Sequence, residues 1–484
     1  MKKLTDILKN TPVREVCGDT AAAIGGLVYD SRAVKPGDCF FAVPGTQSDG
    51  HDYIPIAVEK GAAAIVCERM PADAAEGVAY VLVGDSAGAM ADMAAAFYDY
   101  PSRELKLVGI TGTNGKTTTA TLLYDLVRAM GYKAGLISTV VYKIDGREVE
   151  ATHTTPDSIR LNAMMREMAD AGCAYCFMEC SSHAIVQERT RGLDFAGGIF
   201  SNITHDHLDY HKTFAAYIEA KKLFFDGLPK GAFALTNADD RNGRVMVQNT
   251  AAAVSAYSLR AMADFRCKIV EMHLDGMLLR IDGQELWVGL LGRFNAYNLL
   301  AVYGAAALLG LNRGEVLRVL SMLHAVSGRF EKIRAANGTT AIVDYAHTPD
   351  ALENVIQTIE EIRTPGQQLI VVCGCGGDRD RTKRPEMAAI AVKYATMAVF
   401  TSDNPRHELP EAILDDMVAG LEPGARYLRI ADRAEAIRTA VMLSRPGDII
   451  LVAGKGHETY QIVGDVKHPF DDREEIKKRF ALLN

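Results

Sequence analysis

The clearest chemical signal in the sequence is a glycine- and threonine-rich segment, TGTNGKTT, at residues 111–118. Glycines let a backbone approach a phosphate closely, so that successive N–H groups point at its oxygens. Lys116 would neutralise the β- and γ-phosphates, and the Thr117 hydroxyl would ligate Mg²⁺. The match to the usual phosphate-loop pattern is imperfect, because Ile110 occupies its first glycine position. We predict a phosphate-binding loop, rather than a glycine turn with a surface lysine, made of Gly112, Thr113, Asn114, Gly115, Lys116, Thr117 and Thr118.

Further residues could bind a metal ion. Glu179 ends the apolar run at residues 174–178, and a carboxylate beside a phosphate loop is where Mg²⁺ needs a hard oxygen ligand. The alternative for Glu179 is a carboxylate that caps a helix start. Three histidines within residues 205–211 could suggest zinc, but the nearby phosphate chemistry favours one Mg²⁺ ligand with hydrogen-bonding neighbours. The cysteines at positions 173, 176, 180, 373 and 375 lack a second CxxC pair at zinc spacing, so we expect buried, reduced thiols.

Phosphate binding at this loop requires a strand before it and a helix after it. The apolar run at residues 105–110 predicts the strand, and the amphipathic stretch at residues 117–130 predicts the helix. We therefore predict a central P-loop ATPase domain with a mostly parallel sheet at residues 101–330. Before it, short strand-like runs alternate with helical stretches over residues 1–100, which predicts a small α/β domain.

The last third of the chain alternates strongly apolar runs with helical stretches. This pattern predicts a doubly wound, Rossmann-like C-terminal domain at residues 331–484. The predicted strands cover residues 341–343, 369–372, 397–400 and 449–452. Polar or glycine-rich segments follow them, at Asp344 and at residues 374–380, 403–406 and 454–458. Parallel strands would bring all four segments to one edge of the sheet, which is where such sheets bind ligands.

Composition narrows the class of protein. A chain of 484 residues suggests two to four domains, and a net charge of −8 argues against nucleic acid as the main partner. The N-terminus lacks the apolar stretch of a signal peptide, and no run of about 18 apolar residues predicts a membrane span. We expect a cytoplasmic protein.

The phosphate loop and six other motifs, taken together and in order, resemble the Mur ligases. The other motifs are MECSSH at 178–183, DHLDYH at 206–211, GRFN at 292–295, SGRFE at 327–331, DYAHTPDAL at 344–352 and DNPR at 403–406. The resemblance implies an ATP-dependent ligase that activates a carboxylate as an acyl phosphate and joins it to an amine. The DNPR motif is similar to that of members that add meso-diaminopimelate to UDP-N-acetylmuramoyl-L-alanyl-D-glutamate, a precursor of peptidoglycan.

The resemblance also assigns roles around the nucleotide. Lys116 and Thr117 match the ATP and Mg²⁺ residues, and Glu179 and His207 match further ligands of two Mg²⁺ ions. Lys221 matches a lysine that the family carbamylates, and a carbamate is an anion that can bind the second Mg²⁺. The alternative for Lys221 is a solvated helix lysine. Residues similar to those on the nucleotide side are Asn295, Arg329 and Asp344.

Substrate positions are implied in all three domains. The sugar nucleotide would contact Ser31, Thr46, Gln47 and Ser48, and in the central domain Thr154, Thr155, Ser181, Gln187 and Arg189. His153 departs from the asparagine that many relatives have before Thr-Thr. The amino acid would contact Arg379, Asp403, Asn404, Pro405, Arg406, Gly454 and Glu458. Meso-diaminopimelate carries a second carboxylate and a second ammonium; Arg379 and Arg406 can supply charge-assisted forks for carboxylates, and Glu458 can pair with an ammonium.

Three alternatives remain at this stage. A lysine-adding ligase would leave the arginine of DNPR without its carboxylate. A folylpolyglutamate synthase would not explain the N-terminal segment around residues 29–32. A nucleotide-binding regulatory protein would not need the set Lys116, Thr117, Glu179, His207 and Lys221. We expect a monomer whose domains close during catalysis, because acyl phosphates hydrolyse in open water.

Overall fold

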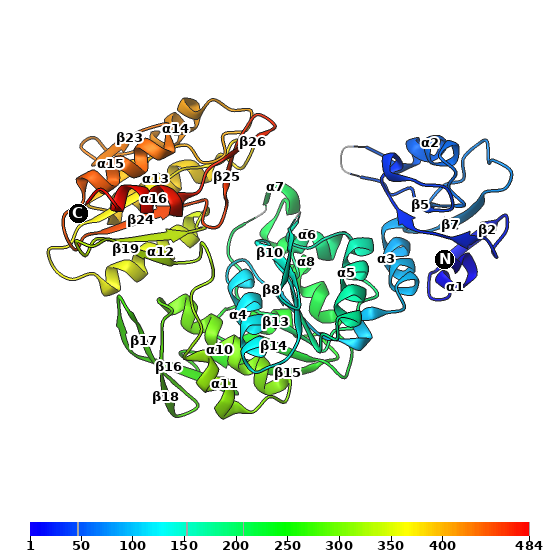
Figure 1. Ribbon diagram of the computed structural model, residues 1–484, viewed down its shortest axis with the longest axis horizontal. Coiled ribbons are helices and arrows are strands. Elements are labelled where there is room, and N and C mark those ends of the chain that lie inside the picture. Colours follow the sequence, from blue (N-terminus) through cyan, green and yellow to red (C-terminus); the bar gives the residue numbers. More distant parts are fainter. Residues whose placement is uncertain (46–47, 152, 207, 484) are drawn as a thin grey trace.

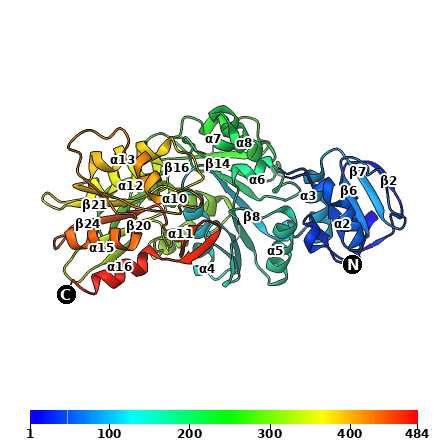
Figure 2. The ribbon, with the colours of Figure 1, turned by 90° about the horizontal axis from the view of Figure 1, so that it is seen from above.

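The computed structural model describes residues 1–45, 48–151, 153–206 and 208–483, with the backbone alone at residues 208 and 209. The chain forms three α/β bodies in a row, with the N-terminal body at one end of an elongated molecule and the C-terminal body at the other (Figures 1 and 2). Each body is built around one large sheet. The predicted α/β class with three domains is confirmed.

The N-terminal body contains a five-stranded sheet in the order β2-β7-β6-β5-β4, in which only β2 is antiparallel to its neighbour. Its elements are β1 (Lys2–Lys3), α1 (Leu4–Ile7), β2 (Val13–Cys17), β3 (Ala23–Ile24), β4 (Leu27–Val28), β5 (Cys39–Phe41), α2 (Ile54–Glu59), β6 (Ala64–Cys67), β7 (Ala79–Val83) and α3 (Ser86–Phe97). Asp85 caps α3 by accepting hydrogen bonds from two backbone N–H groups. The alanine-rich α3 packs against a central helix, α5, and so joins this body to the next.

The central body contains an eleven-stranded sheet in the order β11-β10-β9-β12-β8-β13-β14-β15-β16-β17-β18. Pairing is parallel from β9 to β16 and antiparallel at both edges. The strands are β8 (Lys106–Thr111), β9 (Ala134–Ile137), β10 (Val141–Ile144), β11 (Arg147–Glu150), β12 (Tyr175–Glu179), β13 (Gly197–Phe200), β14 (Phe233–Asn237), β15 (Ala253–Ser258), β16 (Phe265–His273), β17 (Gly276–Ile281) and β18 (Gln284–Val288). Strand β8, which leads into the phosphate loop, therefore lies inside the sheet.

Helices of the central body cover both faces of this sheet (Figure 2). They are α4 (Lys116–Ala129), α5 (Ser158–Asp170), α6 (Ser182–Val186), α7 (Leu208–His211), α8 (Phe214–Asp226), α9 (Gly243–Met246), α10 (Arg293–Leu308) and α11 (Arg313–Leu320). Leu123 on α4 and Leu299 on α10 belong to an apolar cluster that continues through Phe330 to Ile356 in the C-terminal body. The central and C-terminal bodies thus share a core, whereas Phe41 and Val81 belong to a separate N-terminal cluster.

The C-terminal body contains a six-stranded sheet in the order β19-β20-β24-β21-β22-β23, parallel except at β19. Its strands are β19 (Glu331–Arg334), β20 (Thr340–Asp344), β21 (Leu369–Cys373), β22 (Met397–Phe400), β23 (Tyr427–Arg429), β24 (Ile449–Ala453), and the hairpin β25 (Tyr460–Val463) and β26 (Val466–Pro469). Its helices are α12 (Pro349–Ile362), α13 (Lys383–Tyr394), α14 (Pro410–Val418), α15 (Arg433–Leu443) and α16 (Asp472–Phe480). The four predicted polar segments follow β20, β21, β22 and β24 at one edge, as the parallel register requires.

A buried ion pair holds the backbone at this edge of the sheet. Arg433 on α15 forms a fork with Asp472 on α16, at 2.7 and 2.8 Å, and both side chains are fully buried. The same guanidinium donates to the carbonyls of Ser402 and Ala453, which precede two of the polar segments. Within the described residues, no helix combines the length and the apolar character that crossing a bilayer demands.

Candidate active site

The phosphate loop has the predicted strand-loop-helix geometry. Thr111 ends β8, and Lys116 begins α4. Gly112 and Gly115 have positive φ angles of 145° and 87°, and a Cβ atom on Gly112 would lie 2.0 Å from the Ser201 hydroxyl. Only glycine fits such a position without moving the neighbouring strand end. Lys116 Nζ folds back over the loop and donates to the carbonyls of Gly112, at 2.9 Å, and Thr113, at 2.7 Å.

Neighbouring segments fix the rest of this loop. Asn202, just after β13, accepts a hydrogen bond from the Asn114 N–H through its side chain at 2.9 Å, and from the Thr113 N–H through its carbonyl at 2.8 Å. Arg329 donates to the Thr117 hydroxyl at 3.2 Å, and its guanidinium lies over the Tyr345 ring at 4.5 Å. The loop is therefore held by the central sheet on one side and contacted by an arginine from the connection to the C-terminal body on the other.

Glu179 is fully buried at the end of β12, the neighbour of β8. Its two carboxylate oxygens accept hydrogen bonds from Thr139, one from the backbone N–H at 2.7 Å and one from the hydroxyl at 3.2 Å. Ser181, and not Glu179, caps α6. The carboxylate is thus oriented by its neighbours beside the phosphate loop, where it can offer oxygen ligands to a cation. His207 lies outside the described residues.

Lys221 is buried in α8, so the alternative of a solvated helix lysine is wrong. Its Nζ donates to the Gly112 carbonyl at 2.8 Å and lies 4.7 Å from the centre of the Tyr217 ring. Burial, together with the nearby charge of Lys116, holds the pKa of Lys221 well below the ordinary lysine value. A helix distant in sequence therefore brings a second amine to the phosphate loop.

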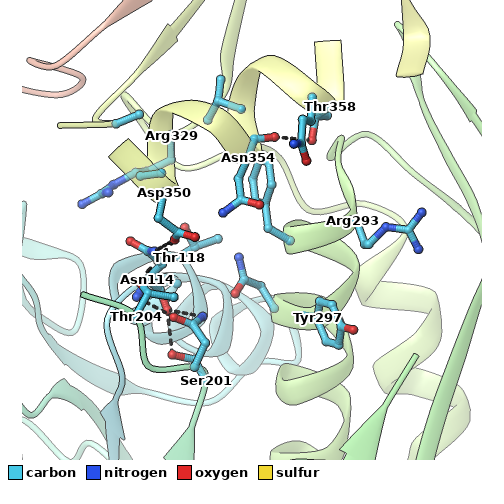
Figure 3. Close-up of a pocket in the computed structure, with 18 of the residues that line it drawn as sticks. Asn114, Thr118, Ser201, Thr204, Arg293, Tyr297, Arg329, Asp350, Asn354 and Thr358 are labelled. Atoms are coloured by element: carbon cyan, nitrogen blue, oxygen red, sulfur yellow. Dashed lines mark hydrogen bonds between the residues drawn. The ribbon is translucent and has the colours of Figure 1, made fainter. Parts of the chain in front are cut away.

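A cavity of about 560 Å³ opens beside the loop, between the central and C-terminal bodies (Figure 3). We call it the interdomain pocket. Its lining includes Asn114, Gly115, Thr118, Ser201, Thr204, Arg260, Arg293, Tyr297 and Asn298 from the central body, Arg329 from the connection, and Asp344, Tyr345, Asp350, Asn354 and Thr358 from the C-terminal body. Asp350 crosses the boundary, because its carboxylate accepts from the Asn114 amide at 3.0 Å and from the Thr204 hydroxyl at 3.3 Å. The pocket combines arginines with aromatic and amide groups, which suits a nucleoside triphosphate.

The three residues predicted to lie on the nucleotide side differ in whether they line this pocket. Asp344 and Arg329 line it, whereas Asn295 is buried beneath it and accepts a hydrogen bond from Asn298 at 3.1 Å. Asp344 accepts from the N–H groups of Phe330 and Ala346, at 2.7 and 2.8 Å, and its burial raises the pKa of the carboxyl. Of these two asparagines on α10, Asn298 lines the cavity and Asn295 does not.

Five predicted substrate residues of the central body form one network next to Glu179. They are Thr154, Thr155, Ser181, Gln187 and Arg189. Thr155 donates to the Glu179 carbonyl at 2.7 Å, and Arg189 donates to the Thr155 carbonyl and to the Gln187 side chain, both at 2.6 Å. Thr154 joins through the Thr139 hydroxyl at 3.1 Å. In the N-terminal body, Ser31 is buried after β4 and Ser48 is exposed, whereas Thr46 and Gln47 lie outside the described residues.

The C-terminal residues meet at the sheet edge. Asn404 donates to Glu458 at 2.9 Å, and the fully buried Lys455 donates to both Glu458, at 2.8 Å, and Asn404, at 3.1 Å. Arg406 donates to the Gly377 carbonyl at 2.8 Å, and burial together with the charge of Arg379 lowers its pKa. Among the described residues, neither arginine forms an ion pair with a carboxylate. Asp403, Pro405 and Gly454 shape the same edge, since a Cβ on Gly454 would lie 2.6 Å from the Asp403 carboxylate.

The sequence alone did not identify several residues of this arrangement. Four residues form hydrogen bonds with the predicted site residues although the sequence assigned them no role: Thr139, Asn202, Asn298 and Asp350. The sequence could have pointed to two of them, because Asp350 lies within the motif at residues 344–352 and Asn298 lies one helical turn after Asn295. Thr139 and Asn202 had no such signal, because only sheet pairing brings them to the loop.

A phosphate loop that opens onto an interdomain pocket, with an arginine-bearing sheet edge in the next body, is the architecture of an ATP-dependent ligase. The chain belongs to the Mur ligase family. Residues 23–98 match the model described as Mur ligase family, catalytic domain. Residues 110–306 match the Mur ligase middle domain, and residues 328–456 match the Mur ligase, glutamate ligase domain.

Individual members of the family are similar to this chain over nearly its full length. A Phocaeicola vulgatus protein named UDP-N-acetylmuramoyl-L-alanyl-D-glutamate–2,6-diaminopimelate ligase is 55% identical over 481 residues, which cover 99% of each chain. A Geobacillus thermodenitrificans protein of the same name is 44% identical over 484 residues, covering 97% of this chain and 98% of that one. A solved structure of a ligase of that name is 32% identical, with a TM-score of 0.71, and covers 100% of this chain and 99% of its own.

Proposed function

We propose that the chain joins meso-diaminopimelate to UDP-N-acetylmuramoyl-L-alanyl-D-glutamate at the expense of ATP, a step of peptidoglycan precursor synthesis. The support is the full-length similarity to relatives named for this reaction, at 55% identity. The choice of meso-diaminopimelate as the amino acid rests on Arg379, Arg406 and Glu458. The two arginines offer cations to a carboxylate of the substrate, and Glu458 offers an anion to an ammonium. The protein would act in the cytoplasm as a monomer, and its product would serve cell shape and division.

Mg²⁺ fits the residues around the phosphate loop. Its preferred ligands are hard oxygens, and Glu179 and Thr117 present a carboxylate and a hydroxyl beside the loop. We assign two Mg²⁺ ions to Thr117, Glu179, His207 and a carbamylated Lys221. When bound, the ions would neutralise charge on the phosphates.

The residues of the chain then divide the reaction between them. The network of Thr155, Ser181 and Arg189 would orient the D-glutamate end of the precursor beside Glu179. An oxygen of its terminal carboxylate attacks the γ-phosphorus of ATP and ADP leaves, while Lys116 neutralises the charge on the transferred group. The product is an acyl phosphate. Closure of the C-terminal body over the interdomain pocket would exclude water from it.

The second step forms the amide. Arg379, Arg406 and Glu458 would hold meso-diaminopimelate so that its deprotonated amine reaches the acyl carbon. The tetrahedral intermediate loses inorganic phosphate as the amide bond forms. Ser31, Thr46, Gln47 and Ser48 would hold the uridine diphosphate end of the precursor, far from the reacting carbon.

The reaction is tested by phosphate release from ATP in the presence of UDP-N-acetylmuramoyl-L-alanyl-D-glutamate. Separate assays would contain meso-diaminopimelate, L-lysine or no amino acid. We expect turnover with meso-diaminopimelate alone. Turnover with lysine would overturn the roles of Arg379 and Arg406, and no turnover with either would remove the proposed reaction. Hydroxylamine should trap the acyl phosphate as a hydroxamate.

Carbamylation of Lys221 has a separate test. Lys221→Met keeps a chain of similar length but cannot form a carbamate, and we expect kcat to fall by about 100-fold, the size of losing one preorganised charged group. The neighbouring Lys222, which pairs with Asp226 on the same helix, provides the matched control in Lys222→Met. Carbon-13 bicarbonate should give a carbamate signal in the wild-type protein and in Lys222→Met, but not in Lys221→Met. A wild-type protein without this signal would contradict the assignment.

A further inference from the structure

Arg384 and Glu408 form a largely buried ion pair next to the loops that carry the two arginines of the amino-acid edge. Arg384 lies in the first turn of α13 and is fully buried, and Glu408 lies just before α14. One guanidinium nitrogen donates to Glu408 Oε1 at 2.8 Å and another donates to Oε2 at 3.0 Å. Such a fork fixes the orientation of both groups as well as their separation.

Both members of this pair also hold the backbone of the loop that carries Arg379. Glu408 Oε1 accepts a hydrogen bond from the Asp378 N–H at 2.7 Å, and Arg384 donates to the Gly376 carbonyl at 3.2 Å. Glu408 itself belongs to the loop that follows β22 and carries Arg406. The ion pair therefore ties together the loops after two adjacent strands of the sheet.

The two loops are in close contact in front of this pair. The Gly377 N–H donates to the Asn404 carbonyl at 2.9 Å, and a Cβ on Gly377 would lie 1.9 Å from the Pro405 carbonyl oxygen. Asp378 and Arg406 both have left-handed backbones, with φ of 53° and 50°. Non-glycine residues keep such conformations only where their surroundings impose them.

We propose that Arg384 and Glu408 are positioning residues for amino-acid selection. Their fork sets the spacing of the loops that carry Arg379 and Arg406, and so the spacing of the two guanidinium groups that bind one carboxylate. The inference rests on the proposed function, in which that carboxylate is the second one of meso-diaminopimelate.

The electrostatics of the pair suit a permanent structural role. The Arg384 guanidinium lowers the pKa of Glu408 to about 2. The carboxylate is thus ionised throughout the neutral range, and the fork does not open as pH varies there. Arg381, whose side chain is largely exposed, adds a second contact to Glu408 at 2.9 Å.

The test is Glu408→Gln, which keeps the size of the side chain but removes its charge and one acceptor. We expect the KM for meso-diaminopimelate to rise by about tenfold, equivalent to about 1.4 kcal/mol, because the two guanidinium groups lose their fixed spacing. The KM values for ATP and for the UDP-linked precursor are expected to stay within about twofold, because the interdomain pocket and the predicted precursor contacts include neither the ion pair nor the two loops that it joins. Steady-state kinetics with each substrate varied in turn measures all three.

Asp416→Asn is the matched control. Asp416 accepts from the same Arg384 guanidinium at 2.8 Å, but it lies on α14, and among the described residues its carboxylate makes no other hydrogen bond. Within the described residues its side chain makes no hydrogen bond to either loop, so we expect the KM values of Asp416→Asn to stay within about twofold of the wild type. A merely stabilising role for Arg384 would make the two variants behave alike, or would raise all three KM values together with a lower Tm.

The outcomes separate this inference from the proposed function. Wild-type turnover with meso-diaminopimelate and an unchanged KM in Glu408→Gln would overturn the inference alone. A wild-type protein with no such turnover would overturn both. If Glu408→Gln does not fold, Glu408→Asp applies the same test, because the shorter side chain cannot reach Arg384 and the Asp378 N–H together. An unchanged KM in that variant would also overturn the inference.

Discussion

Replacing Lys116 with methionine is expected to lower kcat by about 10³-fold, the upper size of effect for removing one preorganised hydrogen-bond donor and the lower size for removing a cation that stabilises phosphoryl transfer. The ammonium of Lys116 lies over the phosphate loop, where negative charge spreads over the transferred phosphoryl group. Methionine keeps the length of the side chain and removes the charge. Its effect should therefore fall on the chemical step.

The contacts of Lys116 explain why the fold should tolerate this change. Among the described residues its Nζ donates to two loop carbonyls, those of Gly112 and Thr113, and no hydrogen bond joins it to a carboxylate. We expect a Tm within a few degrees of the wild type. Phosphate release with all substrates at saturation gives kcat, and calorimetry gives Tm.

Lys133→Met is the control for Lys116→Met. Lys133 is an exposed lysine between α4 and β9, where it pairs with Asp145 at 3.3 Å. Exposed pairs of this kind contribute at most about 1 kcal/mol to stability, so kcat should not change. An unchanged kcat in Lys116→Met would remove the phosphate loop from the mechanism, whereas equal losses in both variants would point to a general effect of lost charge.

Local sequence patterns were enough to predict the phosphate loop and the C-terminal edge. In both cases the predicted geometry depends on one strand and the residues directly after it. The strand at β8 and the helix at α4 appear within one residue of the predicted positions. The four polar segments meet because parallel strands all end at the same edge, a rule that needs no knowledge of side-chain packing.

The environment of Lys221 could not be predicted in this way. A lysine on a helix is most often solvated, and nothing within α8 shows that its Nζ reaches the Gly112 carbonyl. The two residues are 109 positions apart in sequence. Their contact depends on how α8 packs on the central sheet, and only the resemblance to the Mur ligases pointed to this lysine.

Thr139 and Glu408 were missed for the same physical reason. Thr139 reaches Glu179 because β9 and β12 are neighbours in the sheet, although 40 residues separate the two in sequence. Glu408 reaches Asp378 across two loops. Each is a supporting residue whose chemistry is ordinary and whose importance comes from its partner, so no motif marks it.

Replacing Arg406 with methionine is expected to lower kcat/KM for meso-diaminopimelate by about 100-fold, since a hydrogen bond to a charged group contributes about 1.5–3 kcal/mol. Among the described residues, Arg406 forms no ion pair with a carboxylate, and its guanidinium donates to the Gly377 carbonyl. Its charge is therefore available to the substrate. Methionine keeps the apolar stem and tolerates the left-handed backbone no worse than arginine does.

The control for Arg406→Met is Arg438→Met. Arg438 is an exposed arginine on α15 of the same body, and it pairs with Glu435 at 3.1 Å. We expect no change in its kcat/KM, because exposed pairs are weak and this one lies away from the edge.

Selectivity provides the sharper measurement. L-lysine lacks the second carboxylate, so it should gain from the loss of a repelling cation while meso-diaminopimelate loses an attraction. The ratio of kcat/KM for the two amino acids should therefore fall by more than either value changes alone. An Arg406→Met variant that loses activity with meso-diaminopimelate and gains none with L-lysine would assign Arg406 to loop structure, and would leave Arg379 as the arginine that distinguishes the two amino acids.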